Sequence, residues 1–135
     1  MKKLKIILFL TVITLLGVLF IIIPTLMNTC EGYGSRGIIC LKIKDLKKRF
    51  NIFKLDNGTY PTTQEGFNAL IKNPNPKKYP RYSPRGYLKK IPKDPWSTPF
   101  LYIKINNEIE IISFASDRKL GGEDMGKDIK FSECR

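Results

Sequence analysis

The pattern of apolar and polar positions divides the chain into two parts. Residues 6–27 form an unbroken run without a charged side chain, IILFLTVITLLGVLFIIIPTLM. As a helix this run spans about 33 Å, compared with about 30 Å for the hydrocarbon core of a bilayer. We therefore predict a membrane anchor from Ile6 to Met27. Three lysines among the first five residues place its N-terminal end in the cytoplasm by the positive-inside rule.

Two alternatives remain for this N-terminal run. A cleaved signal peptide has an apolar region of about 7–15 residues and a small-residue cleavage site, and neither feature is present here. A lipoprotein would use Cys30, but Met27-Asn28-Thr29 is a poor approach to a lipidated cysteine. The retained anchor is the better interpretation. It gives a basic stub with a transmembrane anchor at residues 1–29 and a periplasmic domain at 30–135.

The domain begins with a pattern typical of an amphipathic helix, from about residue 38 to 55. Apolar side chains recur there at spacings of three and four residues: Ile39, Ile43, Leu46, Phe50 and Phe53. We expect this stripe to be the main packing face against a sheet. Asp56-Asn57-Gly58 ends the helix, because glycine can take the left-handed cap.

The middle of the domain predicts a short helix and then a long irregular loop. Thr62 and Glu65 form a capping box, and a second helix is expected to follow it. Residues 73–99 contain seven prolines, which exclude a helix interior or a central strand. We expect aromatic side chains to pack this loop against the core. They are Tyr79, Tyr82, Tyr87 and Trp96.

Strand-like residues follow the loop. Residues 100–104 and 108–113 alternate around Asn106-Asn107, which is a good hairpin turn. The remaining 22 residues are rich in turns. The fold class is therefore α+β, with helices packed on a small antiparallel sheet.

Charge and composition narrow the function. The chain has 24 lysines and arginines, 12 acids and no histidine, for a net charge of +12. A histidine-based triad and a histidine-ligated zinc site are excluded. The sequence contains no phosphate-binding glycine loop and no serine elbow, so we do not expect an enzyme. Residues 72–93 hold eight basic residues and no acid, which leaves polyanion binding as an alternative.

Three cysteines allow one disulfide. A compartment outside the cytoplasmic membrane permits such a bond. Cys40–Cys134 would tie the C-terminal end to the helix, and Cys30–Cys40 would close a small loop near the membrane. The spacing does not choose between these pairings or exclude three free thiols.

Three segments, taken in order, resemble a known family. They are KLDNGTYPTT at 54–63, YLKKIPKDPWSTPF at 87–100, and SFASD at 113–117 followed by Gly121-Gly122 and Lys127-Asp128-Ile129. Together they are similar to the globular domain of the major pseudopilin of the type II secretion system, general secretion pathway protein G. The resemblance implies a pilin-like fold with a calcium ion in the C-terminal loop. It also implies a structural role in a periplasmic pseudopilus, which helps to export folded proteins.

The N-terminal prepilin motif of that family is not matched. Prepilins carry Gly-Phe-Thr-Leu-x-Glu, whereas the first 30 residues here contain no acidic residue and no Gly-Phe pair. We therefore expect a pseudopilus subunit or a membrane-anchored relative, in a bacterial inner membrane with a single pass. Its partners would be other pseudopilins, inner-membrane secretion components or further copies of itself. The alternatives are a competence-type pilin-like protein that binds DNA and a non-polymerising periplasmic adaptor, although nucleic acid is not the expected partner.

The acidic C-terminal loop is the candidate metal site. Four acids fall within 12 residues of a basic chain, interrupted by glycines that let the loop fold back: Asp117, Glu123, Asp124 and Asp128. Two carboxylates about 5 Å apart repel by about 3 kcal/mol at an effective dielectric of 20, so a cation between them would stabilise the loop. With the resemblance, we expect Ca²⁺ bound by Asp117, Asp124 and Asp128 and by the backbone carbonyls of Phe114 and Lys119. A solvated acidic loop is the alternative.

Overall fold

The computed structural model of the chain describes residues 34–134. The predicted anchor from Ile6 to Met27 and the whole of segment 1–29 lie outside the described residues. Within the part that the structure describes, no helix is both long and apolar enough to cross a membrane. The compact unit Arg36–Arg135 contains all of the described strands.

A long helix covers residues 34–57 and contains the whole of the predicted segment 38–55. All five residues of the apolar stripe are at most 3% exposed, so the stripe is the buried face, as predicted. The helix ends where Gly58 adopts a left-handed backbone with φ of 80° and donates its N–H to the Lys54 carbonyl at 2.7 Å. The periodic spacing of apolar residues therefore predicted this helix correctly, and Asp56-Asn57-Gly58 predicted its end.

The second helix is shorter than its capping box suggested. The reciprocal bonds of the box are present, from the Thr62 N–H to Glu65 Oε2 and from the Glu65 N–H to Thr62 Oγ1. They close a turn, and only α2 (Asn68–Ile71) is helical after it. Gly66 has a φ of 47°, which interrupts a right-handed helix between the box and α2. The predicted short helix is therefore present, but it begins at Asn68 and not directly at the capping box.

Three antiparallel strands form one sheet. They are β1 (Leu101–Ile105), β2 (Glu108–Ser113) and β3 (Ile129–Lys130), in the order β1-β2-β3. The predicted hairpin is confirmed, with Ile105 paired to Glu108 and Asn106 in a left-handed conformation. Strand β3 was not predicted, because two residues are too few to show an alternating pattern.

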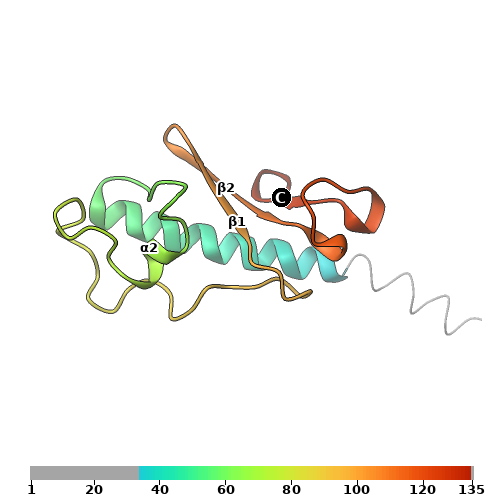
Figure 1. The fold of residues 1–135 in the computed structure, drawn as a ribbon, viewed down its shortest axis with the longest axis horizontal. Helices are drawn as coiled ribbons and strands as arrows, with labels where there is room; N and C mark the ends of the chain where they lie inside the picture. The colour runs from blue at the N-terminus through green and yellow to red at the C-terminus, as the bar shows by residue number, and fades with distance from the viewer. Residues whose placement is uncertain (1–33, 135) are drawn as a thin grey trace, which may run out of the picture. The chain divides into compact units, whose positions relative to one another are not determined.

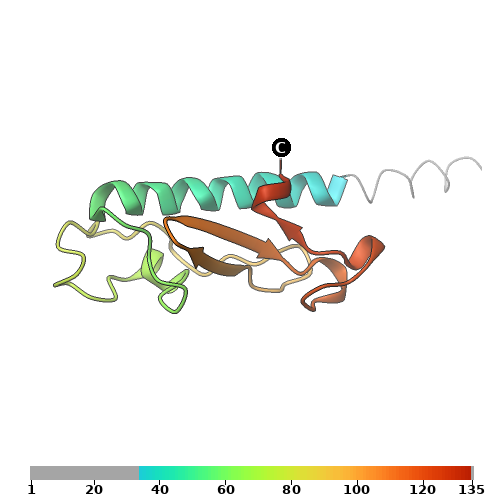
Figure 2. The same cartoon turned by 90° about the horizontal axis from the view of Figure 1, so that it is seen from above.

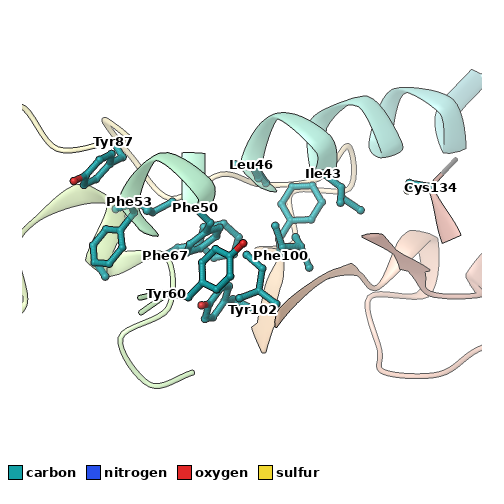
Figure 3. Packing of buried hydrophobic residues seen from close by; sticks show 14 of the residues in the cluster. Ile43, Leu46, Phe50, Phe53, Tyr60, Phe67, Tyr87, Phe100, Tyr102 and Cys134 are labelled. Atoms are coloured by element: carbon teal, nitrogen blue, oxygen red, sulfur yellow. The ribbon is translucent and has the colours of Figure 1, made fainter. Parts of the chain in front are cut away.

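The core lies between the long helix and the sheet, as two layers. Figure 2 shows the helix on one side and the three strands with their loops on the other. Figure 3 shows side chains of the helix stripe meeting rings from the loops and strands. The Phe50 ring stacks on Tyr102 with centroids 4.4 Å apart and lies 5.2 Å from Phe67. Aromatic contact therefore fixes the helix on the sheet.

The proline-rich loop is held by its aromatic side chains, as predicted. Tyr79 is fully buried and Tyr87 is 9% exposed, while Tyr82 and Trp96 are partly buried against the core. The rings of Tyr79 and Tyr87 lie about 5 Å from that of Phe53. This packing orders a segment that has almost no regular secondary structure.

A disulfide joins Cys40 to Cys134 across 94 residues, with Cα atoms 5.2 Å apart. Of the pairings that the sequence left open, the structure has the one that ties the C-terminal end to the long helix. In Figure 1 the C-terminal segment lies over this helix, and Figure 2 shows the same proximity. The bond therefore closes a loop around nearly the whole domain.

Glu65 gives the domain a predicted acid sensitivity. Its carboxylate accepts hydrogen bonds from the Thr62 N–H and the Tyr79 hydroxyl, both at 2.7 Å, and the Lys78 ammonium lies 3.1 Å away. Partial burial raises the pKa of this carboxyl, but the three donors outweigh burial and lower the pKa from 4.5 to about 2. The ionised group therefore stabilises the fold above pH 4.5, and that stabilisation is lost as the pH falls toward 2.

We expect Glu65→Gln to reduce the free energy of unfolding at pH 7 by about 1–2 kcal/mol, a value discounted for the partial exposure of the site. Urea denaturation at pH 7, 4.5 and 2.5 should show the difference from the wild type shrinking at low pH. Glu108→Gln is the control, since Glu108 is 81% exposed and its ion pair with Lys47 is long, at 3.4 Å. A Glu65 effect that is equally large at pH 2.5 and pH 7 would contradict the pKa argument.

Candidate functional site

The C-terminal loop, residues 114–128, leaves β2 and returns as β3. Its ends meet because Ser113 pairs with Ile129 in the sheet. Two short 3₁₀ turns lie within it, Ala115–Asp117 (η1) and Asp124–Gly126 (η2). A third, Phe131–Glu133 (η3), follows β3 and leads to the disulfide at Cys134. The loop is therefore fixed at its base by strand pairing.

A buried carboxylate ties the base of this loop to the proline-rich segment. Asp94 is 5% exposed, and its Oδ2 accepts a hydrogen bond from Ser113 Oγ at 2.8 Å. Its Oδ1 accepts from the N–H groups of Trp96 and Thr98. The contact with Ser113 crosses 19 residues and leaves no local pattern in the sequence.

The loop backbone is bent by residues in the left-handed region. Ala115, Arg118 and Asp124 have φ between 47° and 59°, although none of them is glycine. Gly121 and Gly122 have φ of 103° and 84°. Each non-glycine residue in this region costs about 1 kcal/mol or more, and such strain persists where surrounding contacts impose it. The conformation of this loop is therefore one that its own propensities do not favour.

Two of the predicted ligands lie against the same glycine pair. Asp128 Oδ2 accepts the N–H of Gly121 at 3.0 Å. Asp117 Oδ1 accepts the N–H of Lys119, and its other oxygen faces Gly122, where an added Cβ would lie 2.6 Å from it. The glycines predicted to let the loop fold back thus allow Asp117 and Asp128 to approach the same turn.

Asp128 is the unusual member of this pair. It is 5% exposed, and its Oδ1 is buried without a hydrogen-bond partner among residues 34–134. An unsatisfied buried polar atom costs about 1–3 kcal/mol, and more when it carries charge. A cation beside Oδ1 would remove this cost, so the residue fits a metal site.

The other predicted ligands are less closely associated. Asp124 is exposed at the start of η2, and within the described residues no three acidic side chains gather closely enough to hold a metal ion. Phe114 precedes η1, and Lys119 follows it by two residues. Calcium takes about 6–8 oxygen ligands, and these can be backbone carbonyls as well as carboxylates. A loop with few carboxylates is therefore still chemically suited to calcium.

Comparison with known proteins decides the family. The family model "Type II secretion system (T2SS), protein G" matches residues 36–132, which include the helix, the sheet and the whole C-terminal loop. The chain belongs to this family. The resemblance found in three sequence segments is thereby confirmed.

Relatives in the protein G family are similar over most of their length. The type II secretion system core protein G of Vibrio cholerae is 32% identical, with 87% of this chain and 82% of the relative covered. That of Pseudomonas aeruginosa is 34% identical, with coverages of 87% and 85%. The crystal structure of the major pseudopilin from enterohaemorrhagic Escherichia coli superimposes with a TM-score of 0.62 at 26% identity, covering 74% of this chain and 84% of that one. The pilin-like α+β fold is therefore shared with the major pseudopilin of a type 2 secretion system.

Proposed function

We propose that this chain is a structural component of a type II secretion system, as a pseudopilus subunit or a membrane-anchored relative. The match to the protein G family over residues 36–132 is the observation that carries the proposal. Its role is protein–protein contact with other pseudopilins and with inner-membrane secretion components, and catalysis has no part in it.

The proposed location is the bacterial inner membrane, with residues 30–135 in the periplasm. The apolar run at 6–27 supports a single-pass anchor, and the Cys40–Cys134 disulfide suits an oxidising compartment. The alignment with the Vibrio cholerae protein covers 87% of the chain, so it must include part of the N-terminal segment. The relatives thus share more with this chain than the globular domain.

A secretion experiment tests the proposed function. Deleting the gene in its own host should leave proteins that are normally exported trapped in the periplasm, and the full chain supplied in trans should release them. Comparing periplasmic and culture-medium fractions measures the effect. Normal export without this chain would show that it is not a working part of the secretion system.

DNA binding through residues 72–93 is less well supported. Single-stranded nucleic acid binds to exposed aromatic rings on which its bases stack. In this loop Tyr79 and Tyr87 are buried and Tyr82 and Trp96 pack against the core, so the rings hold the fold. Apart from Lys78, which pairs with Glu65, the lysines and arginines of residues 72–93 make no ion pair among the described residues.

We further propose that the C-terminal loop binds Ca²⁺. Asp117 and Asp128 would supply carboxylate oxygens, with Asp124 and the carbonyls of Phe114 and Lys119 as further ligands. The unpartnered Oδ1 of Asp128 and the strained backbone around it support this proposal. The ion would offset the repulsion of the carboxylates and hold the loop in its bent conformation.

Calcium should therefore stabilise the domain. At a calcium concentration 100 times the dissociation constant, the expected gain is about 2.7 kcal/mol in the free energy of unfolding. Thermal melting of the full chain, with excess calcium and with EDTA, measures it. Asp128→Asn should abolish the gain, whereas Glu123→Gln, an exposed acid of the same loop, should leave most of it. Identical melting curves with calcium and EDTA would refute the calcium proposal.

A further inference from the structure

A groove runs along the long helix on the side of the proline-rich loop. One wall is the helix segment 42–49, and the other is loop segment 85–93. The groove has a volume of about 860 Å³. It lies apart from the C-terminal loop, because none of residues 114–128 lines it.

Two cationic side chains from the helix hold the walls together. Lys42 Nζ donates a hydrogen bond to the Lys93 carbonyl at 2.8 Å. About two turns further along the helix, Arg49 Nη1 donates to the Tyr87 carbonyl at 2.9 Å. Each bond joins the helix to one end of the loop segment, so the spacing of the walls is set by the fold. Gly86 also fixes the loop, because an added Cβ there would lie 2.8 Å from the Ile71 carbonyl oxygen.

The groove is strongly basic. Six of its lining side chains carry positive charge: Lys42, Arg49, Arg85, Lys89, Lys90 and Lys93. Asp45 is the one acid in the lining, and its carboxylate is already bound to Arg49 Nε at 3.0 Å. Among the described residues, the side chains of Arg85, Lys89 and Lys90 make no ion pair, so their charges are open to a ligand.

Apolar side chains lie between these charges. Leu46 is buried beneath the groove, Leu88 is partly buried, and Ile91 is 41% exposed. An apolar centre with a charged rim is the usual anatomy of a protein–protein interface. No exposed aromatic ring lines the groove, because its one aromatic residue, Tyr87, is 9% exposed. The groove therefore offers no ring on which the bases of a nucleic acid could stack.

We propose that this basic groove binds an acidic, partly apolar segment of a different protein. Carboxylates of the segment would pair with Lys89, Lys90 and Arg85, and an apolar side chain would cover Ile91. A second copy of this chain fits less well, because the acids of its C-terminal loop are interspersed with Arg118, Lys119 and Lys127. This inference goes beyond the proposed function, since neither pseudopilus membership nor calcium binding requires it.

The experiment uses the full chain in detergent and two fluorescent peptides of equal negative charge. One alternates glutamate and leucine, and the other contains glutamate with serine in place of leucine. We expect the leucine peptide to bind more tightly, with an affinity that falls as salt rises. A single-stranded oligothymidine of the same charge should bind more weakly than the leucine peptide.

Matched variants locate the binding. Lys89→Glu/Lys90→Glu should weaken binding of the leucine peptide by about tenfold or more. Lys72→Glu/Lys77→Glu makes the same change in net charge on the same basic loop, outside the groove lining, and should have little effect. Ile91→Ser should reduce the preference for leucine over serine, whereas Ile105→Ser, at an exposed end of β1, should not. Melting curves confirm that each variant is folded.

Several results would overturn the proposal. Equal loss of binding in both lysine pairs would show general charge attraction, and equal binding of oligothymidine would show a polyanion site. No saturable binding of either peptide would also contradict it. If the Lys89 and Lys90 changes altered only self-association in analytical ultracentrifugation, the groove would be a contact between copies. The calcium response of the melting curve is independent of all these outcomes.

Discussion

Replacing Cys40 and Cys134 together by serine is expected to destabilise the domain by about 2–5 kcal/mol. The disulfide closes a loop of 94 residues, and in the chain-entropy model a bond that closes about 100 residues restricts the unfolded state by about 4.7 kcal/mol. A domain of this size has about 5–15 kcal/mol of total stability, so the loss is a large fraction of it. Urea denaturation followed by circular dichroism measures the change.

Reducing agent provides the internal control for this prediction. Wild-type protein with reductant should unfold at about the same urea concentration as the double serine variant without it. The variant itself should not respond to reductant. If the reduced wild type kept its full stability, the bond between the helix and the C-terminal end would not be a main source of stability.

The cysteine pairing is a feature that could not be predicted from the sequence. Cys40 lies on the long helix and Cys134 directly follows η3, and they meet only because the loop returns as β3. That strand has two residues and is defined by pairing with Ile112 and Ser113. Such a pairing depends on tertiary contacts, so the sequence left several pairings open.

The long helix and the hairpin could be predicted because their sequence patterns repeat within each element. The helix stripe repeats over four turns, and the hairpin repeats over two strands around Asn106-Asn107. In each case several residues report the same element, so one irregular position does not alter the interpretation. The capping box at Thr62 and Glu65 is a single local motif, and it closes a turn ahead of the short helix α2 and does not start that helix.

The two candidate sites also differ in how much of each could be predicted from the sequence. The acids of the C-terminal loop are close in sequence, so their proximity was foreseeable, and Asp117 and Asp128 do lie against one glycine pair. The burial of Asp128 and its unpartnered Oδ1 depend on tertiary packing, which the spacing of the acids does not reveal. The basic groove was visible as charge in residues 72–93, but its other wall comes from the helix.

Truncating Phe50 is expected to have an effect as large as losing the disulfide, and by a different mechanism. Its ring is fully buried between the helix and the sheet, stacked on Tyr102 and near Phe67. Phe50→Ala removes these contacts and leaves a cavity, and we expect it to lower the free energy of unfolding by about 3–5 kcal/mol. Because the disulfide acts mainly on the unfolded state, reductant should still destabilise the Phe50 variant further.

Ile52→Ala is the matched control for Phe50→Ala. Ile52 lies on the opposite face of the same helix and is 50% exposed, so its truncation should change stability by about 0.5 kcal/mol or less. Denaturation curves of the two variants, measured side by side, separate burial from helix propensity. If Phe50→Ala lost no more stability than Ile52→Ala, the aromatic contacts between the helix and the sheet would not determine how the two layers pack. The buried stripe would then have predicted the position of the helix without explaining the stability of the fold.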